Sequence, residues 1–370
     1  MKITNVSLER LRLPLEPAFH AAWDRSPRRA FEATVVVIDT DEGIRGIGSG
    51  DTMDGFEPYV DYFIGEDPLR IQRHVEVLET INFHAGHYWP FEAALWDVIG
   101  QALGQPVSVL FGGATDRIPA YASLGELKER AERVDSVLAL RAMGFRAVKL
   151  RVDQFRIDEG IDAVAAVREA VGSTMEIMVD FNQAWRMPGD IVPSLDVRAI
   201  ARVSRTLADL DVFWIEEPLP AGDVRGLAAL RNQTALRIAG GEMCRSVPEV
   251  LAYFNADALD VYQPDVVLAV GMLRARLVAQ LCQAQHRWFT PHTWTNGLGL
   301  LANLHVAAGV GGGPYFEFPF DPPGWTLERR DFFLAEPVTI DAVGNVVVPN
   351  RPGLGATLND DAVARWRVGD

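Results

Sequence analysis

The segment Trp214-Ile215-Glu216-Glu217-Pro218 constrains the fold more than any other stretch, because an apolar run ends there in two adjacent carboxylates and a proline. Proline cannot extend a central strand, so these acids lie where a buried strand stops. Similar arrangements flank the segment: the apolar run 177–179 ends at Asp180, and the run 236–241 ends at Glu242. Barrel enzymes hold their catalytic groups at such strand ends.

Any one of these acids, taken alone, is more often a loop residue or a helix N-cap than a metal ligand. The repetition changes that interpretation. Asp180 and Glu216 are about 36 residues apart, and Glu216 and Glu242 about 26, each about the length of one βα repeat. The three carboxylates are therefore expected on neighbouring strand ends. Because no His or Cys accompanies them, they suit a hard cation, Mg²⁺ before Zn²⁺.

The composition is that of an ordinary soluble protein, with 370 residues, 48% of them hydrophobic, and a net charge of −15. This charge argues against nucleic acid and against an anionic membrane as partners. The two cysteines, Cys244 and Cys282, have no metal-type spacing and form no disulfide framework, so a reducing cytoplasm is expected. The N-terminus shows no signal-peptide pattern, and no apolar run has membrane-spanning length.

Residues 1–115 are expected to form an α+β unit. Strand patterns occur near residues 3–13, 33–38 and 44–48, and helical periodicity at 69–78 and 91–103. Residues 16–29 fit neither pattern. They form either a solvated loop, which is the commoner case, or a lid over a site.

Residues 116–320 alternate between strand and helix patterns, which predicts a parallel barrel. The expected strands end near eight residues: Ser123, Lys149, Asp180, Glu216, Glu242, Asp265, Thr290 and Glu317. Residues 321–370 contain a hairpin-like pattern at 337–340 and 346–348. This tail is too short for a domain of its own, so we expect it to return to the N-terminal unit.

Lys149 and Arg151 are two residues apart on an expected strand, so they face the same side. Each cation opposes protonation of the other, and Lys149 is therefore expected to have a lowered pKa and to act as a base. The alternative is a strand edge with solvated basic residues. Asp265 and His292 lie on adjacent expected strands, where the aspartate would fix the imidazole tautomer. An isolated histidine after proline is, however, more often structural or exposed.

Together these motifs resemble the mandelate racemase subgroup of the enolase superfamily. The resemblance runs nearly end to end and rests on ordered motifs around Lys149-Leu150-Arg151, Val179-Asp180-Phe181-Asn182, Trp214-Ile215-Glu216-Glu217-Pro218, Gly241-Glu242, Gln263-Pro264-Asp265, Pro291-His292 and Glu317. It implies an α/β fold in which an α+β capping domain covers a modified (β/α)₇β TIM-type barrel, with a C-terminal segment that returns to the capping domain.

The resemblance also implies roles for individual residues. Mg²⁺ would bind Asp180, Glu216 and Glu242, and the substrate carboxylate would bind the metal. Lys149 would be a base on one face of the substrate α-carbon, and the His292–Asp265 pair the acid or base on the other face. Glu317 would donate a hydrogen bond to the substrate carboxylate.

The chain departs from the family pattern at some positions. The mandelate-racemising member has lysine at both cationic positions, whereas Arg151 stays charged and cannot act as a base, so it suits tuning of Lys149 or substrate binding. Asn182 replaces the histidine of the mannonate dehydratase branch, and we expect it to contact substrate. In the lid candidate, His20 and Trp23 are further substrate-binding candidates, although they match no lid of known specificity.

We therefore predict a cytoplasmic Mg²⁺-dependent lyase that dehydrates a sugar acid by α-proton abstraction and loss of the β-hydroxyl. The alternative is a racemase, epimerase or cycloisomerase on the same scaffold. A more remote alternative is a non-catalytic carboxylate-binding barrel. The expected partner is a small carboxylate substrate, with no nucleic acid and no membrane, and we expect a homo-oligomer.

Overall fold

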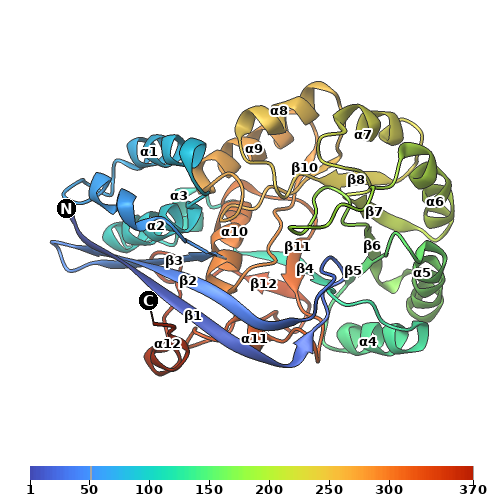
Figure 1. Ribbon diagram of the computed structural model, residues 1–370, viewed down its shortest axis with the longest axis horizontal. Helices are drawn as coiled ribbons and strands as arrows, with labels where there is room; N and C mark the ends of the chain where they lie inside the picture. The colour runs from blue at the N-terminus through green and yellow to red at the C-terminus, as the bar shows by residue number, and fades with distance from the viewer. Residues whose placement is uncertain (51, 370) are drawn as a thin grey trace.

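The computed structural model describes residues 1–50 and 52–369. The N-terminal part is a three-stranded antiparallel sheet with helices packed on one face (Figure 1). Its elements are β1 (Ile3–Phe19), β2 (Arg28–Thr40), β3 (Arg45–Gly50), η1 (Glu57–Tyr62), α1 (Ile71–His84), α2 (Trp89–Leu103) and α3 (Val107–Leu110). All the strands and both helices expected in this part are present, and the first two strands are longer than the sequence pattern indicated.

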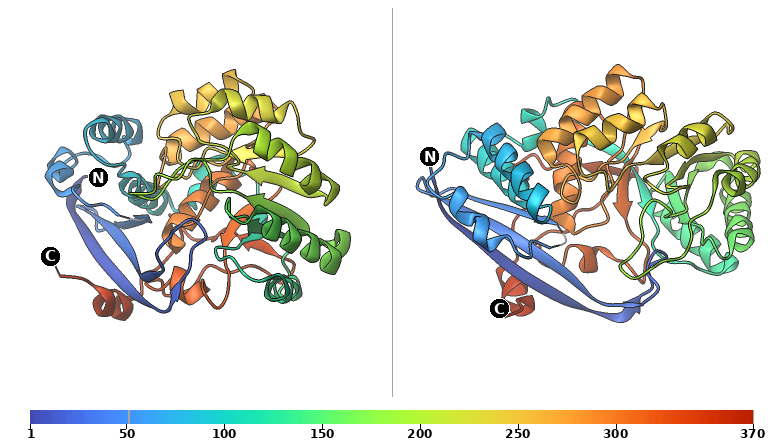
Figure 2. Two further views of the ribbon diagram at one scale, coloured as in Figure 1. Left: turned by 45° about the vertical axis from the view of Figure 1, so that its right-hand side comes forward. Right: turned by 45° about the horizontal axis from the view of Figure 1, so that its top comes forward.

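The central part is a curled parallel sheet with the strand order β10-β9-β8-β7-β6-β5-β4-β11. The amide of Gly313, just before β11, donates to Phe289 O of β10 over 2.6 Å. Each strand from β4 to β10 is followed by a helix, and these helices surround the sheet (Figure 2). The elements are β4 (Arg117–Ser123), α4 (Arg130–Ala142), β5 (Ala147–Arg151), α5 (Ile157–Val171), η2 (Gly172–Thr174), β6 (Glu176–Asp180), α6 (Val197–Asp209), β7 (Val212–Glu216), α7 (Val224–Arg231), β8 (Arg237–Gly240), α8 (Val247–Asn255), β9 (Val261–Tyr262), α9 (Met272–Ala284), β10 (Trp288–Phe289), α10 (Gly297–Val310) and β11 (Phe316–Pro319).

This arrangement is an α/β barrel of the TIM type, as the sequence predicted. A buried layer of side chains from β4 to β9 fills its interior, including Tyr121, Met178 and Trp214. Trp214 stands two residues before Glu216 on β7, so both side chains point to the same face of the sheet. The apolar layer therefore forms a floor, and the charged residues at the strand ends lie above it.

The β1–β2 hairpin reaches from the N-terminal sheet to the barrel (Figure 1), where Trp23 in its tip lies over Arg151, the last residue of β5. The expectation of an irregular segment at residues 16–29 was only partly correct, since β1 continues to Phe19 and β2 begins at Arg28. The hairpin tip is docked by backbone pairing, because the amide of Ala22 donates to Gly125 O over 2.8 Å. Apolar packing of Phe19 against the barrel extends the strand beyond what its local pattern indicates.

The C-terminal segment contributes to both parts. It contains α11 (Leu327–Arg330), β12 (Asn345–Val347) and α12 (Asp360–Trp366). The expected hairpin is present only in part: an isolated antiparallel bridge joins Ile340 to Val346, and β12 pairs along its length with β4, where Val346 lies opposite Ile118. Further on, the amide of Val368 donates to Arg10 O of β1 over 2.9 Å. None of the helices in the described residues has the length and apolar character needed to cross a membrane.

Helix α2 fastens the N-terminal part to the rest through two buried carboxylates. Glu92 accepts hydrogen bonds from the amides of Met272 (2.9 Å) and Leu273 (2.8 Å), which begin α9. Asp97 accepts from the amides of Ile47 (2.9 Å) in β3 and Leu354 (2.7 Å) in the C-terminal segment. These carboxylates satisfy backbone donors that would otherwise be buried without a partner.

We expect Asp97→Ala to lower the free energy of unfolding by about 2 to 4 kcal/mol, because it leaves two buried amides without an acceptor. Asp97→Asn keeps one acceptor oxygen and should cost about half as much. Urea denaturation followed by circular dichroism measures both differences. An Asp97→Ala protein with the wild-type urea midpoint would show that these two bonds contribute nothing.

Candidate active site

The acids that the sequence singled out lie together at one end of the barrel. Asp180 and Glu216 are the last residues of β6 and β7 and are register partners in the parallel ladder. Glu242 follows the end of β8 by two residues. All three side chains are buried. The parallel strands therefore gather three carboxylates at a single edge of the sheet.

Two cations from β5 contact these acids. Lys149 Nζ contacts Glu216 and lies 3.4 Å from Asp180 Oδ2 and 2.7 Å from Glu317 Oε1. Arg151 contacts Asp180 through Nη1 and donates from Nε to Leu124 O over 2.9 Å. Both cations face the barrel interior and are buried, so the alternative of a solvated strand edge is wrong.

The expected lowering of the Lys149 pKa is also wrong in this structure. Burial and Arg151 both act to lower the pKa of Lys149, but the carboxylates of Glu216 and Glu317 outweigh them and raise it above its ordinary value. Burial raises the pKa of Glu216 to about 8, although Lys149 opposes that shift. The sequence argument considered only the neighbouring cation, whereas the fold surrounds Lys149 with acids.

His292 and Asp265 form the expected pair. His292 Nδ1 is 3.0 Å from Asp265 Oδ2. The other oxygen, Asp265 Oδ1, accepts from the amide of Val267 (2.8 Å) and from Asn303 Nδ2 (3.2 Å), so the carboxylate is held in place. Burial alone would lower the pKa of His292, but Glu242, Glu317 and Asp265 raise it to about 10. Because Nδ1 is bonded to Asp265, Nε2 is the ring nitrogen that faces the other acids, and it lies 3.8 Å from Glu242 Oε2.

Glu317 accepts hydrogen bonds in this structure, whereas the resemblance implied that it donates one to the substrate carboxylate. Its Oε1 accepts from Ser123 Oγ over 2.8 Å, and its Oε2 accepts from the amide of Thr293 over 2.7 Å. Burial acts to raise the pKa of Glu317, but Lys149 and His292 outweigh it and lower that pKa to about 2. The donor role of Glu317 toward a substrate stays a prediction of the resemblance.

The hairpin tip covers Arg151 with an aromatic side chain. The guanidinium carbon of Arg151 is 4.9 Å from the ring centroid of Trp23 and 5.7 Å from that of Trp294. The two indole rings contact each other edge to face at 4.8 Å. Trp294 Nε1 donates to Ser123 Oγ over 2.8 Å, which connects this aromatic wall to Glu317.

A cavity of about 330 Å³ lies beside this wall and is lined by residues of the hairpin tip and of the loops after β5 and β6. It is lined by the substrate-binding candidates His20, Trp23 and Asn182, together with Arg25 and Arg186. His20 is exposed, and its backbone amide donates to Glu126 Oε1 over 3.2 Å. Asn182 Oδ1 accepts from Arg151 Nη1 over 3.1 Å.

Some residues of the site were not singled out from the sequence. Trp185 Nε1 donates to Glu242 Oε1 over 2.7 Å, and Gln263 Nε2 donates to Glu216 Oε2 over 2.8 Å. Ser123 and Trp294 connect Glu317 to the hairpin tip, as described above. Ser123 and Gln263 stand at strand ends within the patterns already noted, so their position was a usable signal. Trp185 and Trp294 lie in loops, where no periodicity reveals them.

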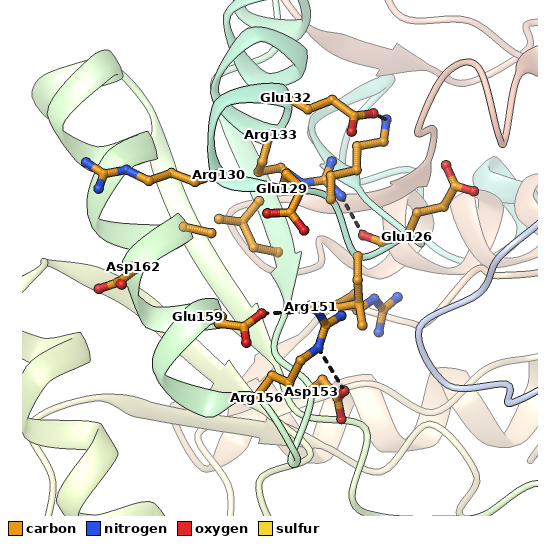
Figure 3. A pocket seen from close by; sticks show the side chains of 15 residues that line it. Glu126, Glu129, Arg130, Glu132, Arg133, Arg151, Asp153, Arg156, Glu159 and Asp162 are labelled. Atoms are coloured by element: carbon orange, nitrogen blue, oxygen red, sulfur yellow. Dashed lines mark hydrogen bonds and ion pairs between the residues drawn. The ribbon is translucent and has the colours of Figure 1, made fainter.

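A second hollow of about 400 Å³ lies outside the barrel mouth, between α4 and α5 (Figure 3). Some of its charged side chains pair with one another: Arg156 lies 3.1 Å from Glu159 Oε2 and 3.8 Å from Asp153 Oδ2. Arg133 pairs with Asp321 at 3.2 Å. This hollow is a solvated groove between helices, and it lacks the buried acids of the barrel mouth.

The barrel mouth has the donor chemistry for a divalent cation. Among residues 1–50 and 52–369, no three His, Cys, Asp or Glu side chains are already arranged to hold a metal ion, because Lys149 and Arg151 contact the oxygens of Glu216 and Asp180. The three buried carboxylates nevertheless offer only oxygen ligands, as Mg²⁺ prefers. Burial raises the pKa of Glu242, and so does the charge of Asp180, which shows that these acids repel one another. The residues therefore fit a cation that neutralises them.

Comparisons with known proteins agree with this geometry. Residues 130–362 match the enolase C-terminal domain-like family. The chain is 29% identical to D-galactarolactone cycloisomerase of Agrobacterium fabrum, over all of both chains. It is 30% identical to L-talarate/galactarate dehydratase of Salmonella typhimurium, over 83% of this chain and 73% of that protein. A solved racemase from Streptomyces coelicolor with bound magnesium superposes with a TM-score of 0.83, at 28% identity, over 99% of this chain and 100% of that one. The chain therefore belongs to the enolase superfamily, among its mandelate racemase-like members.

Proposed function

We propose that this chain is a Mg²⁺-dependent enzyme that removes the α-proton of a sugar acid and expels the oxygen substituent at the β-carbon. The observation that carries the proposal is the convergence of Lys149, the His292–Asp265 pair and three buried carboxylates at one barrel mouth. Our preferred reaction is dehydration of an aldonate or aldarate, with the β-hydroxyl as leaving group.

The residues divide this chemistry between two positions. The proton next to a carboxylate is weakly acidic, and a bound divalent cation would supply the positive charge that stabilises the developing enediolate. Lys149 lies on β5 and would take the α-proton once a substrate draws it away from the acids it now contacts. His292 follows β10 and, held by Asp265, would deliver a proton to the departing oxygen from Nε2.

Cycloisomerisation is the second candidate, and the full-length likeness to a galactarolactone cycloisomerase favours it. The same two residues would serve both reactions, because opening a lactone ring by elimination also removes an α-proton and expels a β-oxygen. The difference lies in whether the leaving oxygen departs as water or stays attached to the product.

A panel of aldonates, aldarates and their lactones, incubated with protein and Mg²⁺, tests the proposal. Dehydration gives a 2-keto product that has lost the mass of one water, whereas cycloisomerisation of a lactone gives a keto acid of unchanged mass. Mass spectrometry separates these outcomes. Interconversion of stereoisomers without any keto product would replace both candidates with a racemase. No conversion and no α-proton exchange with any acid would leave a carboxylate-binding barrel.

We expect Trp23→Ala to raise KM by about tenfold and to leave Mg²⁺ affinity unchanged, because it removes one aromatic face from Arg151 beside the cavity. Steady-state kinetics on the substrate found in the panel measure the effect. Trp366→Ala is a matched control, since it removes a tryptophan that contacts Arg365 on α12, away from the barrel mouth. Equal KM values for both variants would show that the hairpin tip is ordinary surface.

A further inference from the structure

Glu217, which directly follows the proposed ligand Glu216, is a buried carboxylate without a hydrogen-bond partner. Its side chain is 2% exposed, and neither Oε1 nor Oε2 has a partner among the described residues. The backbone is fixed, because the amide of Glu217 donates to Ala239 O over 3.0 Å and its carbonyl accepts from the amide of Gln183 over 2.9 Å. The backbone of Glu217 is therefore held in place, while its carboxylate has no hydrogen-bond partner among the described residues.

The conformation at Glu217 is itself unfavourable. Its φ of +42° lies in the left-handed region, which a residue with a side chain rarely adopts. Strained backbone of this kind persists mainly at functional sites. A structural role would require donors around the carboxylate, as Glu92 and Asp97 have, and Glu217 has none in the described part of the chain.

The surroundings of Glu217 are acidic. Burial raises the pKa of Glu217, and the charges of the three proposed ligands, Glu242, Asp180 and Glu216, raise it further, while Lys149 acts to lower it. A second unpartnered acceptor lies beside the same group: Gln263 is fully buried, and it donates from Nε2 to Glu216 while its Oε1 has no partner. Buried acceptor oxygens without donors, next to a group of carboxylates, are unfavourable unless a positive charge lies among them.

We infer that Glu217 is a fourth carboxylate of the divalent-cation site, where it supplies negative charge and acceptor oxygens beside Glu242. This inference rests on the proposed function only in requiring that the site binds a cation. Glu217 acts as a positioning residue: it strengthens cation binding and does not exchange a proton with substrate. The same charge destabilises the cation-free protein, because it is buried among like charges.

Glu217→Gln tests the inference, because it removes the charge, keeps the shape and breaks no hydrogen bond of the side chain. Glu249→Gln is the matched control. Glu249 lies in the first turn of α8, where it accepts from Ser246, the residue that caps this helix, and glutamine serves equally well in that capping arrangement. Binding of Mn²⁺, followed by electron paramagnetic resonance of the free ion, and binding of Mg²⁺, followed by calorimetry, are measured without substrate for both variants and the wild type.

We expect Glu217→Gln to weaken binding of both ions by about 10-fold to 100-fold, a range typical of residues that support metal ligands. Glu249→Gln should stay within about twofold of wild type. The cation-free Glu217→Gln protein should also have a higher Tm than the cation-free wild type, and this distinguishes a lost charge from a damaged fold. Should Glu217→Gln not fold, Glu217→Met tests the same loss of charge.

Cation affinity within about twofold of wild type in the Glu217 variants would overturn the inference, as would a wild type that binds neither ion. The experiments distinguish a failure of this inference from a failure of the proposed function. Weakened binding in Glu217→Gln together with no product from the sugar-acid panel would leave Glu217 in the cation site and refute the reaction. Unchanged cation binding in Glu217→Gln, together with a product from the sugar-acid panel, would refute the role of Glu217 and support the proposed reaction.

Discussion

Lys149→Met should abolish both product formation and exchange of the substrate α-proton with D₂O, while His292→Asn should abolish product formation alone. Loss of a general base typically lowers the rate by about 10²-fold to 10⁴-fold. Lys149 would exchange the α-proton without help from the other side of the mouth, whereas His292 would be needed only when the β-oxygen departs. Proton NMR of recovered substrate measures exchange, and mass spectrometry measures product.

Lys128→Met is the matched control, because Lys128 is also a largely buried lysine, paired with Asp321 at 3.1 Å, outside the barrel mouth. It should retain both exchange and turnover. Reversed roles would give the opposite pattern, in which the histidine variant loses exchange and the lysine variant keeps it. That result would move the base from β5 to the loop after β10.

Glu216→Gln should reduce Mg²⁺ affinity by at least about 100-fold and turnover with it, because it removes a charged ligand while keeping the shape of the side chain. Glutamine can keep one acceptor oxygen for Gln263, so the fold should survive. Calorimetry with Mg²⁺ and turnover before and after chelator treatment measure the effect, with Glu249→Gln as control. Turnover that survives both the substitution and the chelator would exclude a metal at this position.

The barrel and the location of its site could be predicted because the acids repeat with the βα period and each closes an apolar run. Asp180 and Glu216 became register partners for that reason alone. The pKa of Lys149 could not be predicted in the same way, since it depends on acids from three other strand ends that the local sequence does not reveal. The contact of Trp23 with Arg151 likewise depends on where a hairpin tip docks, which the pattern of residues 16–29 does not encode.

The fastening of α2 has a consequence for the order in which this protein folds during synthesis. Domains usually fold in the order in which they leave the ribosome. Here Asp97 binds the amide of Leu354, the amide of Val107 donates to Gly353 O, and β1 is bonded to Val368. The N-terminal strands therefore cannot form all their native hydrogen bonds until the C-terminal residues have been made. Asp97 of α2 lacks one of its hydrogen-bond donors while more than two hundred intervening residues are translated. We expect the nascent N-terminal part to need the protection of a chaperone until the C-terminal segment emerges.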